Sequence, residues 1–233
     1  MEQSKRYRAS SKKIDPGKSY TLEESVKLMK ETSPAKFDET VDLAIRLGVD
    51  PKKSDQAVRG TVALPHGTGK SIRVLVLCKA PKDKEAVDAG ADFVGLEEYI
   101  KKIEGGWSDV DAVVATPDVM KDVGKLGKYL GRKGLMPNPK AGTVTFDVAQ
   151  AVKQLKAGRI EFRVDRFGNV HATVGKLSFT AEKLVENIQA LMDQILRLKP
   201  ASLKGQYVQN ISVSSTMGPG IKIEKSTLVE AVK

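Results

Sequence analysis

The chain has 233 residues, of which 40% are hydrophobic and 29% charged, as in soluble globular proteins with one large or two smaller domains. No stretch approaches the roughly 18 apolar residues of a membrane-spanning helix, which excludes a membrane-spanning protein. The net charge of +10 favours polyanionic partners, with nucleic acid the leading class. The single cysteine, Cys78, excludes a disulfide within the chain, and its apolar neighbours predict a buried thiol.

The first third of the chain predicts a helix followed by strands with one wet face. Residues 1–18 are basic without an apolar core, so we expect a polar arm, no signal peptide and a cytoplasmic protein. Thr21 and Glu24 form a capping box that opens a helix. Apolar and polar residues alternate strictly from Val41 to Val49 and more weakly over 58–64, which predicts two half-buried strands in an antiparallel or mixed sheet.

After Gly67 the pattern changes to strands that are apolar on both faces and alternate with helices. Such strands indicate a parallel, Rossmann-like α/β unit. The expected elements are strands at 72–78, 91–95 and 111–116 and helices at 82–90, 95–104, 117–130 and 147–157.

From Arg159 the first pattern returns, with alternation over 160–165, a Phe-Gly-Asn turn and a hairpin partner at 170–174. A helix over 180–198 and a last strand over 207–215 follow. The helix carries one apolar stripe, formed by Leu184, Ile188, Leu191, Ile195 and Leu198.

The two outer segments therefore predict one discontinuous α+β domain, residues 1–67 and 159–233, with a Rossmann-like α/β domain, residues 68–158, inserted into it. The fold class is α/β. Gly67, Gly69 and Gly158 lie at the two connections, where glycine permits a paired hinge.

Charge is distributed unequally between the predicted domains. The outer domain holds 24 Lys and Arg against 17 Asp and Glu, a balance of +7, and the inserted domain holds 15 against 12, or +3. The inserted domain still contains a local basic cluster over residues 121–140, opposed only by Asp122. Its members are Lys121, Lys125, Lys128, Arg132, Lys133 and Lys140.

No motif typical of catalysis or of a metal site is found. GTGKS at 67–71 has Leu64 where a phosphate loop requires glycine, and a strand follows it instead of a helix. His66 and His171 have no companions at metal-ligand spacing, so structural roles are expected. The acidic residues Glu23, Glu24, Asp38, Glu39 and Asp42 are expected on solvent faces or at helix starts. We predict no enzyme, no cofactor and no metal.

The last strand ends in SVSSTMGPG, residues 212–220. Alternation places Ser212, Ser214 and Thr216 on one face, where small hydroxyls are suited to ribose and phosphate groups. Met217 offers an adaptable apolar contact, and Gly218 lets a partner's backbone approach closely. A solvated strand end with a Gly-Pro-Gly stop explains the same residues equally well.

AKFDETV, residues 35–41, supplies a complement to that strand end. Lys36 is suited to pair with a phosphate and Phe37 to stack on a base, although a core position is the usual fate of an aromatic residue. Aromatic residues are only 5% of the chain, which favours structured RNA over a naked strand. Arg163 and Arg166 either follow phosphates or are simply solvated.

Four stretches occur together and in order: AKFDETVDLAIRLGVDPKKSDQAVRGTVALPHGTGK, GLMPNPKAGTV, AGRIEFR and STMGPG. With them the sequence closely resembles, over essentially its whole length, the bacterial family of ribosomal protein one of the large subunit, found in the mobile stalk beside the tRNA exit site. The resemblance implies a split α/β domain from both termini and an inserted Rossmann-like domain that holds no nucleotide.

The resemblance also implies the function. We expect a structural constituent of the large ribosomal subunit that binds large-subunit rRNA at the stalk, assists release of deacylated tRNA from the exit site, and represses translation of its own operon mRNA. We expect a free monomer with no membrane partner.

The site residues are carried over by position. The family's RNA-contacting motif falls on Lys36, Phe37, Thr40, Thr216, Met217 and Gly218. A secondary contact with RNA or tRNA is expected at Lys128, Arg132, Lys133 and Lys140. The family usually has Pro-Arg where Arg132 and Lys133 stand, so this loop keeps its charge but loses the rigidity of proline.

Two other protein classes stay open on the residues alone. The parallel sheet and the basic cluster over 121–140 are also compatible with an enzyme that acts on a phosphorylated metabolite, although a fold never assigns chemistry by itself. A DNA-binding regulator is the third class, but no helix combines basic and amide residues suited to the major groove.

Overall fold

The structure is a computed structural model of the chain that describes residues 4–33 and 35–226. It contains two compact units: the terminal unit, Met1–Gly69 with Ile160–Lys233, and the inserted unit, Lys70–Arg159. Both divisions lie within two residues of the boundaries predicted from sequence. Helices and sheets occur in both units, so the predicted mixed α/β class is confirmed.

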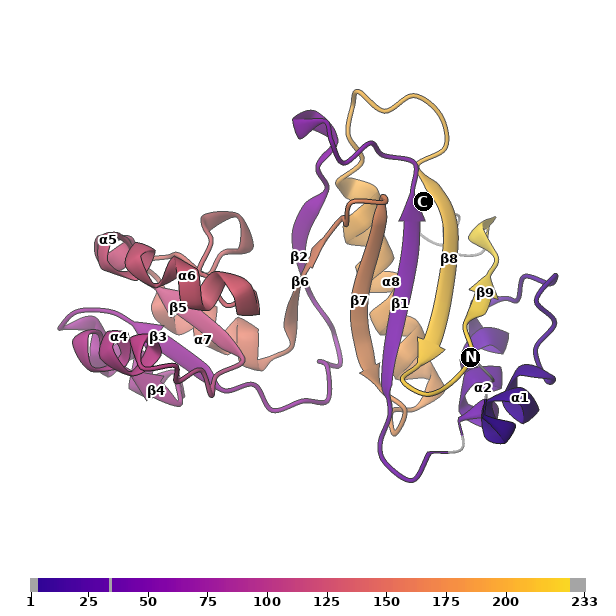
Figure 1. Cartoon of the computed structure of the whole chain (residues 1–233), viewed down its shortest axis with the longest axis horizontal. Helices are drawn as coiled ribbons and strands as arrows, with labels where there is room; N and C mark the ends of the chain where they lie inside the picture. Colours follow the sequence, from indigo (N-terminus) through magenta and orange to yellow (C-terminus); the bar gives the residue numbers. More distant parts are fainter. Residues whose placement is uncertain (1–3, 34, 227–233) are drawn as a thin grey trace. The chain divides into compact units, whose positions relative to one another are not determined.

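The terminal unit is built on a four-stranded sheet (Figure 1). The strands β1 (Thr40–Leu47), β7 (Asn169–Lys176), β8 (Val208–Ser215) and β9 (Ile221–Ile223) follow the order β7-β1-β8-β9. All neighbours are antiparallel. The unit also contains the two-stranded sheet of β2 (Arg59–Ala63) and β6 (Arg159–Arg163), the helices α1 (Lys5–Ser11), α2 (Leu22–Thr32) and α8 (Ala181–Arg197), and a 3-10 turn at Ser54–Gln56.

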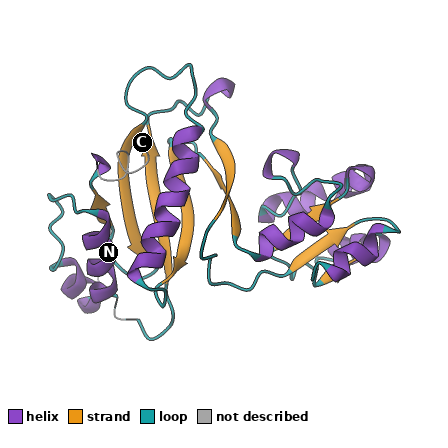
Figure 2. Cartoon of the chain, turned by 180° about the vertical axis from the view of Figure 1, so that it is seen from behind, coloured by secondary structure: helices purple, strands orange, loops and turns teal. Residues whose placement is uncertain are grey.

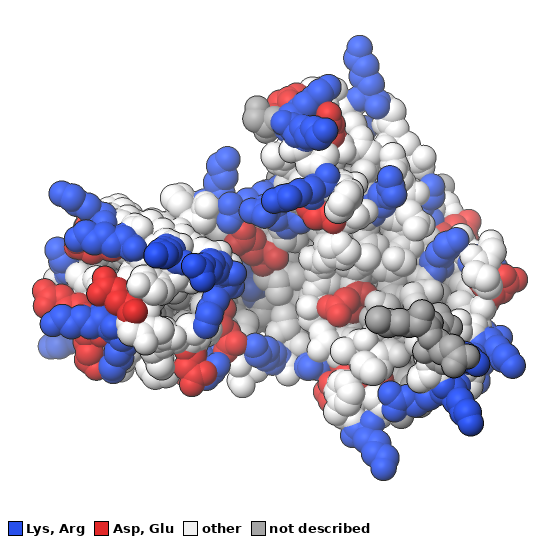
Figure 3. Space-filling view, viewed as in Figure 1, with Lys and Arg blue, Asp and Glu red and all other residues white. Residues whose placement is uncertain are grey.

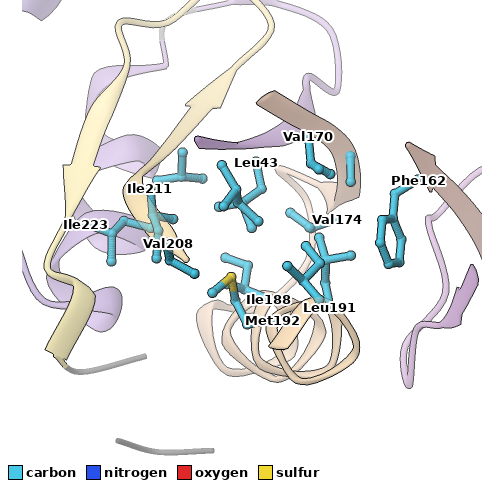
Figure 4. Close-up of a cluster of buried hydrophobic side chains, with 14 of the residues drawn as sticks. Leu43, Phe162, Val170, Val174, Ile188, Leu191, Met192, Val208, Ile211 and Ile223 are labelled. Atoms are coloured by element: carbon cyan, nitrogen blue, oxygen red, sulfur yellow. The ribbon is translucent and has the colours of Figure 1, made fainter. Parts of the chain in front are cut away.

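One face of the large sheet is covered by α8, as the view from behind in Figure 2 shows. The predicted alternation of β1 is confirmed, because Val41, Leu43, Ile45 and Leu47 are all buried. The α8 side chains Ile188, Leu191 and Met192 point toward the sheet in Figure 4 and meet this buried row. Of the predicted helix stripe, only Leu198 is not buried. It is 39% exposed because it lies at the C-cap of α8, beyond the last helical residue.

Helix α2 begins where the sequence predicts. The Thr21 hydroxyl accepts a hydrogen bond from the backbone N–H of Glu24, and the Glu24 carboxylate accepts one from the N–H of Thr21. This reciprocal arrangement satisfies two backbone donors that would otherwise lack partners at the helix start. Val26 and Met29 are buried on its inner face.

Three local features of the terminal unit differ from the sequence-based expectation or add to it. The segment expected as a polar arm contains α1, which Ser4 caps. The expected hairpin does not form as a paired ribbon, because β6 pairs with β2 and β7 with β1, leaving one isolated bridge between Val164 and Val170. The short strand β9 was not expected; its alternating Ile221 and Ile223 are buried beside β8.

The inserted unit has a three-stranded parallel sheet in the order β4-β3-β5. All four residues of the central strand are buried, with Leu75 and Leu77 in the core on one face and Val74 and Val76 in the core on the other. The strand is apolar on both faces because the sheet has a hydrophobic core on each side, as the sequence predicted. The elements are β3 (Val74–Leu77), α3 (Lys82–Asp88), β4 (Phe93–Val94), α4 (Glu97–Glu104), β5 (Ala112–Ala115) and α7 (Val148–Lys156).

The helix expected over 117–130 is broken into short pieces. Two α-helical turns, α5 (Met120–Val123) and α6 (Gly127–Leu130), alternate with 3-10 turns at Pro117–Val119, Gly124–Leu126 and Gly131–Lys133. Glycine is a poor helix former, and each of the last three of these short segments begins with one: Gly124, Gly127 and Gly131. The apolar spacing is helical, but the backbone propensity is too low for one continuous helix.

Cys78 is buried, and its thiol donates a hydrogen bond of 3.0 Å to Asp83 Oδ1. Burial raises the pKa of this thiol to about 12, followed in importance by the bond to Asp83. The residue therefore behaves as a small core side chain, as predicted. Within the described part of the chain, no helix is long and apolar enough to span a bilayer.

Candidate nucleic-acid interface

The face of the large sheet opposite α8 is uncovered and polar; in Figure 1 it is turned toward the viewer. Cross-strand register places Asp42 opposite both Ser214 and Thr173, and Ala44 opposite both Ser212 and His171. We call this surface the open face. It is formed by Thr40, Asp42, Ala44 and Arg46 of β1, Asn169, His171, Thr173 and Lys176 of β7, and Asn210, Ser212 and Ser214 of β8.

Three small hydroxyls, those of Thr173, Ser212 and Ser214, lie in the middle of the open face. The Thr173 hydroxyl donates to Asp42 Oδ1 over 2.8 Å, so this carboxylate is already occupied. The Ser212 hydroxyl makes only a long 3.4 Å bond to the carbonyl of Ala44, and Ser214 is half-buried. The predicted placement of Ser212 and Ser214 on a common polar face agrees with this register.

At one end of the open face two distant segments are hydrogen-bonded together. Thr216 N–H donates to the Thr40 carbonyl over 3.1 Å, and Thr40 N–H donates to the Thr216 hydroxyl over 3.0 Å. Phe37 is 54% exposed and Met217 is 49% exposed, so neither serves the core. We call this region the Met217 end; it comprises Lys36, Phe37, Thr40, Thr216, Met217 and Gly218, the six residues of the predicted RNA-contacting motif.

Glu39 contradicts its sequence-based expectation, because it is 0% exposed instead of lying on a solvent face. Its Oε2 accepts a hydrogen bond of 2.9 Å from the backbone N–H of Met217, while its Oε1 is buried and has no hydrogen-bond partner among the described residues. A buried carboxylate with so few partners is energetically unfavourable. Glu39 therefore fixes the backbone of Met217 at a cost to stability.

Sequence reasoning also missed Lys176. This residue lies directly opposite Thr40 in the β1–β7 register, and its ammonium group donates to the Thr40 hydroxyl over 2.9 Å. The register brings a cation to the Met217 end from 136 residues along the chain. Lys176 is the last residue of β7, and only the pairing of β7 with β1 shows that it lies beside Thr40.

Gly218 is required by a close approach to Ser215. A Cβ at position 218 would lie 2.4 Å from the Ser215 hydroxyl oxygen, which is buried and bonded to the Ser33 hydroxyl over 2.7 Å. We predict that Gly218→Ala lowers the free energy of unfolding by about 1–2 kcal/mol through overpacking. Denaturant unfolding measures this loss. In a Ser215→Ala background the same substitution is expected to cost clearly less, and an equal cost in both backgrounds would show that this contact is not the cause.

Arg163 and Arg166 do not join the Met217 end. Arg163 is exposed on β6 in the separate two-stranded sheet. Arg166 is exposed in the turn before β7, and the Leu47 N–H donates to Gly168 of that turn over 2.8 Å, which places the turn at the opposite end of β1. The residues predicted to form one RNA site therefore divide into two groups. Lys and Arg side chains gather toward both ends of the terminal unit on the face drawn in Figure 3.

In the inserted unit, three of the four predicted secondary contacts come together. Lys128, Arg132 and Lys133 line a cavity of about 190 Å³ together with Trp107 and Tyr129. The Lys133 ammonium group donates to the Ser108 hydroxyl. Lys140 is exposed on the 3-10 turn Pro139–Ala141 and does not line this cavity.

The three connection glycines all have left-handed backbone conformations, with φ of 65° at Gly67, 72° at Gly69 and 99° at Gly158. A Cβ at Gly69 would lie 2.8 Å from Lys176 Cγ. The Gly67 carbonyl accepts a hydrogen bond of 3.0 Å from the buried Asn187. Gly67 and Gly69 are therefore anchored to the terminal unit, and the hinge stays a prediction.

Both histidines contact carboxylates. His66 Nε2 lies 2.5 Å from Glu186 Oε2, and His171 Nε2 lies 3.6 Å from Asp165 Oδ2. Over residues 4–33 and 35–226, no three His, Cys, Asp or Glu side chains are grouped so as to hold a metal ion.

The terminal unit thus presents an open polar sheet surface with the cation Lys176 at one end and Arg46 at the other. Residues 29–219 match the family described as the Ribosomal protein L1p/L10e family. The chain belongs to this family of ribosomal proteins. The family predicted from sequence is thus confirmed, and so is the prediction that the protein is not an enzyme.

Relatives match over nearly the whole chain. The chain is 59% identical to large ribosomal subunit protein uL1 of Chlorobium luteolum over 225 residues, covering 97% of this chain and 98% of the relative. It is 57% identical to the uL1 protein of Chlorobaculum tepidum, covering 97% of each chain. Identity to the uL1 protein of Protochlamydia amoebophila is 56% over 221 residues, covering 95% of this chain and 94% of the relative.

Proposed function

We propose that the protein is a constituent of the large ribosomal subunit and binds large-subunit rRNA of the stalk through the open face of its terminal unit. The observation that carries this proposal is the Met217 end. There Phe37 and Met217 are about half exposed in a region that also holds the Thr40 and Thr216 hydroxyls and the cation Lys176. Large apolar side chains such as these are normally buried in a core.

The chemistry of the Met217 end suits folded RNA. Hydroxyls of Thr40 and Thr216 are able to exchange hydrogen bonds with ribose 2′-OH groups, which distinguish RNA from DNA. Phe37 offers a stacking surface for one unpaired base, and Lys36 and Lys176 offer charges for the phosphates beside it. This combination supports a structured RNA with an exposed base over a regular duplex.

We also propose two finer roles that the family resemblance implies. The Lys128, Arg132 and Lys133 cluster supports a secondary contact with deacylated tRNA as it leaves the exit site, with Lys140 as a further phosphate contact. Repression of the protein's own operon mRNA would use the Met217 end, Ser212, Ser214, Arg163 and Arg166, the same residues as rRNA. Because the same residues would contact both RNAs, their binding is mutually exclusive.

We propose a hinge at the two connections, whose glycines all have left-handed backbone conformations. We predict that Gly158→Ala narrows the distribution of distances between spin labels placed one on each unit, since an alanine at φ of 99° is strained and excludes part of the backbone's freedom. Double electron–electron resonance measures the distribution. Gly67→Ala tests the other connection in the same way, and unchanged distributions in both variants would contradict the hinge.

The proposed function is tested by titrating the purified protein with the stalk rRNA fragment and with a matched duplex over a series of salt concentrations. Specific binding predicts a preference of about 10³-fold or more for the fragment at each salt concentration. The operon leader mRNA is expected to displace the fragment competitively. Equal affinity for fragment and duplex would show that the protein binds RNA only through its net positive charge, without recognising the stalk fold, and would overturn the proposal.

A further inference from the structure

A second surface lies at the other end of β1 from the Met217 end. It surrounds a cavity of about 570 Å³ whose walls come from the end of β1, the 3-10 turn at 54–56, the turn before β7 and the loop that precedes β8. We call it the Phe167 surface; the residues that matter here are Arg46, Lys53, Phe167, Lys204 and Gln209.

Phe167 is 80% exposed, more than any other large hydrophobic side chain in the described residues. Its turn is nevertheless firmly held: Asp165 Oδ1 accepts hydrogen bonds of 2.8 Å from the N–H groups of Phe167 and Asn169. These backbone donors, with that of Asn169 the largest influence, lower the pKa of Asp165, so its carboxylate is ionised at neutral pH. The ring is thus presented to solvent by an ordered turn.

The turn is also docked tightly on the end of β1. Gly168 has a φ of 84°, and a Cβ there would lie 3.1 Å from the Leu47 carbonyl oxygen and 3.3 Å from that of Val49. Only glycine fits this backbone and this approach. The sheet therefore fixes the backbone of this turn, and with it the place from which Phe167 projects, relative to Arg46 of β1.

The cations around the cavity are available to a ligand. Arg46, Lys53 and Lys204 are exposed, and no carboxylate among the described residues forms an ion pair with them. Arg46 is oriented by a hydrogen bond of 3.1 Å from its Nε to Gln209 Oε1. The single acid in the lining, Asp50, accepts a bond from the backbone of Lys52. Three cations against one acid give the surface a net positive charge that suits an anion.

We propose that the Phe167 surface is a second nucleotide-binding site, at which one unpaired RNA base stacks on Phe167 and the adjoining phosphates contact Arg46, Lys53 and Lys204. The inference rests on the proposed function, because it extends the same RNA's contact. Thr40 and Arg46 are six residues apart on β1, about 20 Å. The polar open face joins the two ends, so a folded RNA spans both. Isolated exposure of one ring among unpaired cations fits RNA better than an apolar protein interface.

The test compares the stalk rRNA affinities of Phe167→Ala, the double variant Lys53→Ala with Lys204→Ala, and wild type. Phe167→Ala is expected to weaken binding about 10-fold or more, the effect of losing one base stack, without changing the salt dependence. The lysine variant is expected to reduce the slope of log K against log salt by about 1.5, one phosphate contact per lysine. Chemical probing should show an unpaired nucleotide that wild type protects and Phe167→Ala does not.

The matched control is Lys27→Ala with Lys183→Ala, which removes two exposed lysines from α2 and α8 and is expected to leave the slope unchanged. If both Phe167-surface variants bind and protect RNA like wild type while Met217→Asp does not, the second site is wrong and the proposed function stands. If Met217→Asp also binds like wild type, the proposed function itself fails. A photocrosslinker at position 167 that captures a neighbouring protein in assembled subunits, and no RNA, would also overturn the second site.

Discussion

Met217→Asp is expected to lower the affinity for the stalk rRNA fragment by about 100-fold or more while leaving binding to a plain duplex almost unchanged. The backbone of Met217 is held by Glu39, so the new carboxylate cannot easily turn away from an RNA seated on Thr40 and Thr216. It replaces an apolar contact with a negative charge facing phosphates, and like charges in contact cost several kcal/mol. Equilibrium titration at fixed salt measures the change.

Phe37→Ala is the companion test of the same end, with an expected loss of about 10- to 100-fold from the missing stack. Two substitutions in the inserted unit serve as matched controls. Val87→Asp introduces the same charge at a side chain that is 59% exposed. Phe146→Ala removes an aromatic ring that is also 59% exposed, close to the 54% of Phe37. If the controls weaken binding as much as Met217→Asp and Phe37→Ala do, the Met217 end is not the RNA site.

Phe162→Ala is expected to destabilise the terminal unit by about 3–5 kcal/mol. Phe162 is 1% exposed, and its ring points from β6 toward Leu191 and Val174 in Figure 4. A Cβ at Gly60 of β2 would come within 3.0 Å of this ring, so the ring closes the gap between the small sheet and the main core. Alanine leaves a cavity there that the paired strands cannot collapse to fill.

Urea unfolding followed by circular dichroism measures this loss. Phe167→Ala is the matched control, because it deletes the same side chain at an exposed position and is expected to change the unfolding free energy by less than about 0.5 kcal/mol. The inserted unit has its own cores, so its unfolding should not shift in either variant. An unfolding curve for Phe162→Ala that coincides with the wild-type curve would contradict the assignment of Phe162 to the core.

The parts of the fold that were predictable are those written in local periodicity. The alternation over β1 and the one-sided stripe of α8 each arise from a single element that buries one face against the same core. The doubly buried β3 and β5 likewise follow from a parallel sheet covered on both sides. The capping box at Thr21 is a local exchange of hydrogen bonds that needs no tertiary contact.

The parts that failed depend on which strands become neighbours. Glu39 stands just before an alternating strand and looks solvated, but the Met217 segment, 178 residues away in sequence, covers it. Lys176 enters the site through the register of β7. Arg166 leaves it because β7 pairs antiparallel with β1 and Asn169 lies opposite Arg46, so the turn before β7 lies at the far end of β1. No local pattern encodes these pairings, and each changed the membership of the candidate site.

The central strand of the large sheet also sets an order of events during synthesis. β1 is made early, yet both of its neighbours, β7 and β8, come from the last third of the chain. The inserted unit, by contrast, is contiguous from Lys70 to Arg159 and is complete before either partner strand exists. The inserted unit is therefore expected to fold first, at a stage when neither edge of β1 has a partner strand. The Met217 end needs Thr216, Met217 and Gly218, so it is complete only after nearly the whole chain has been made.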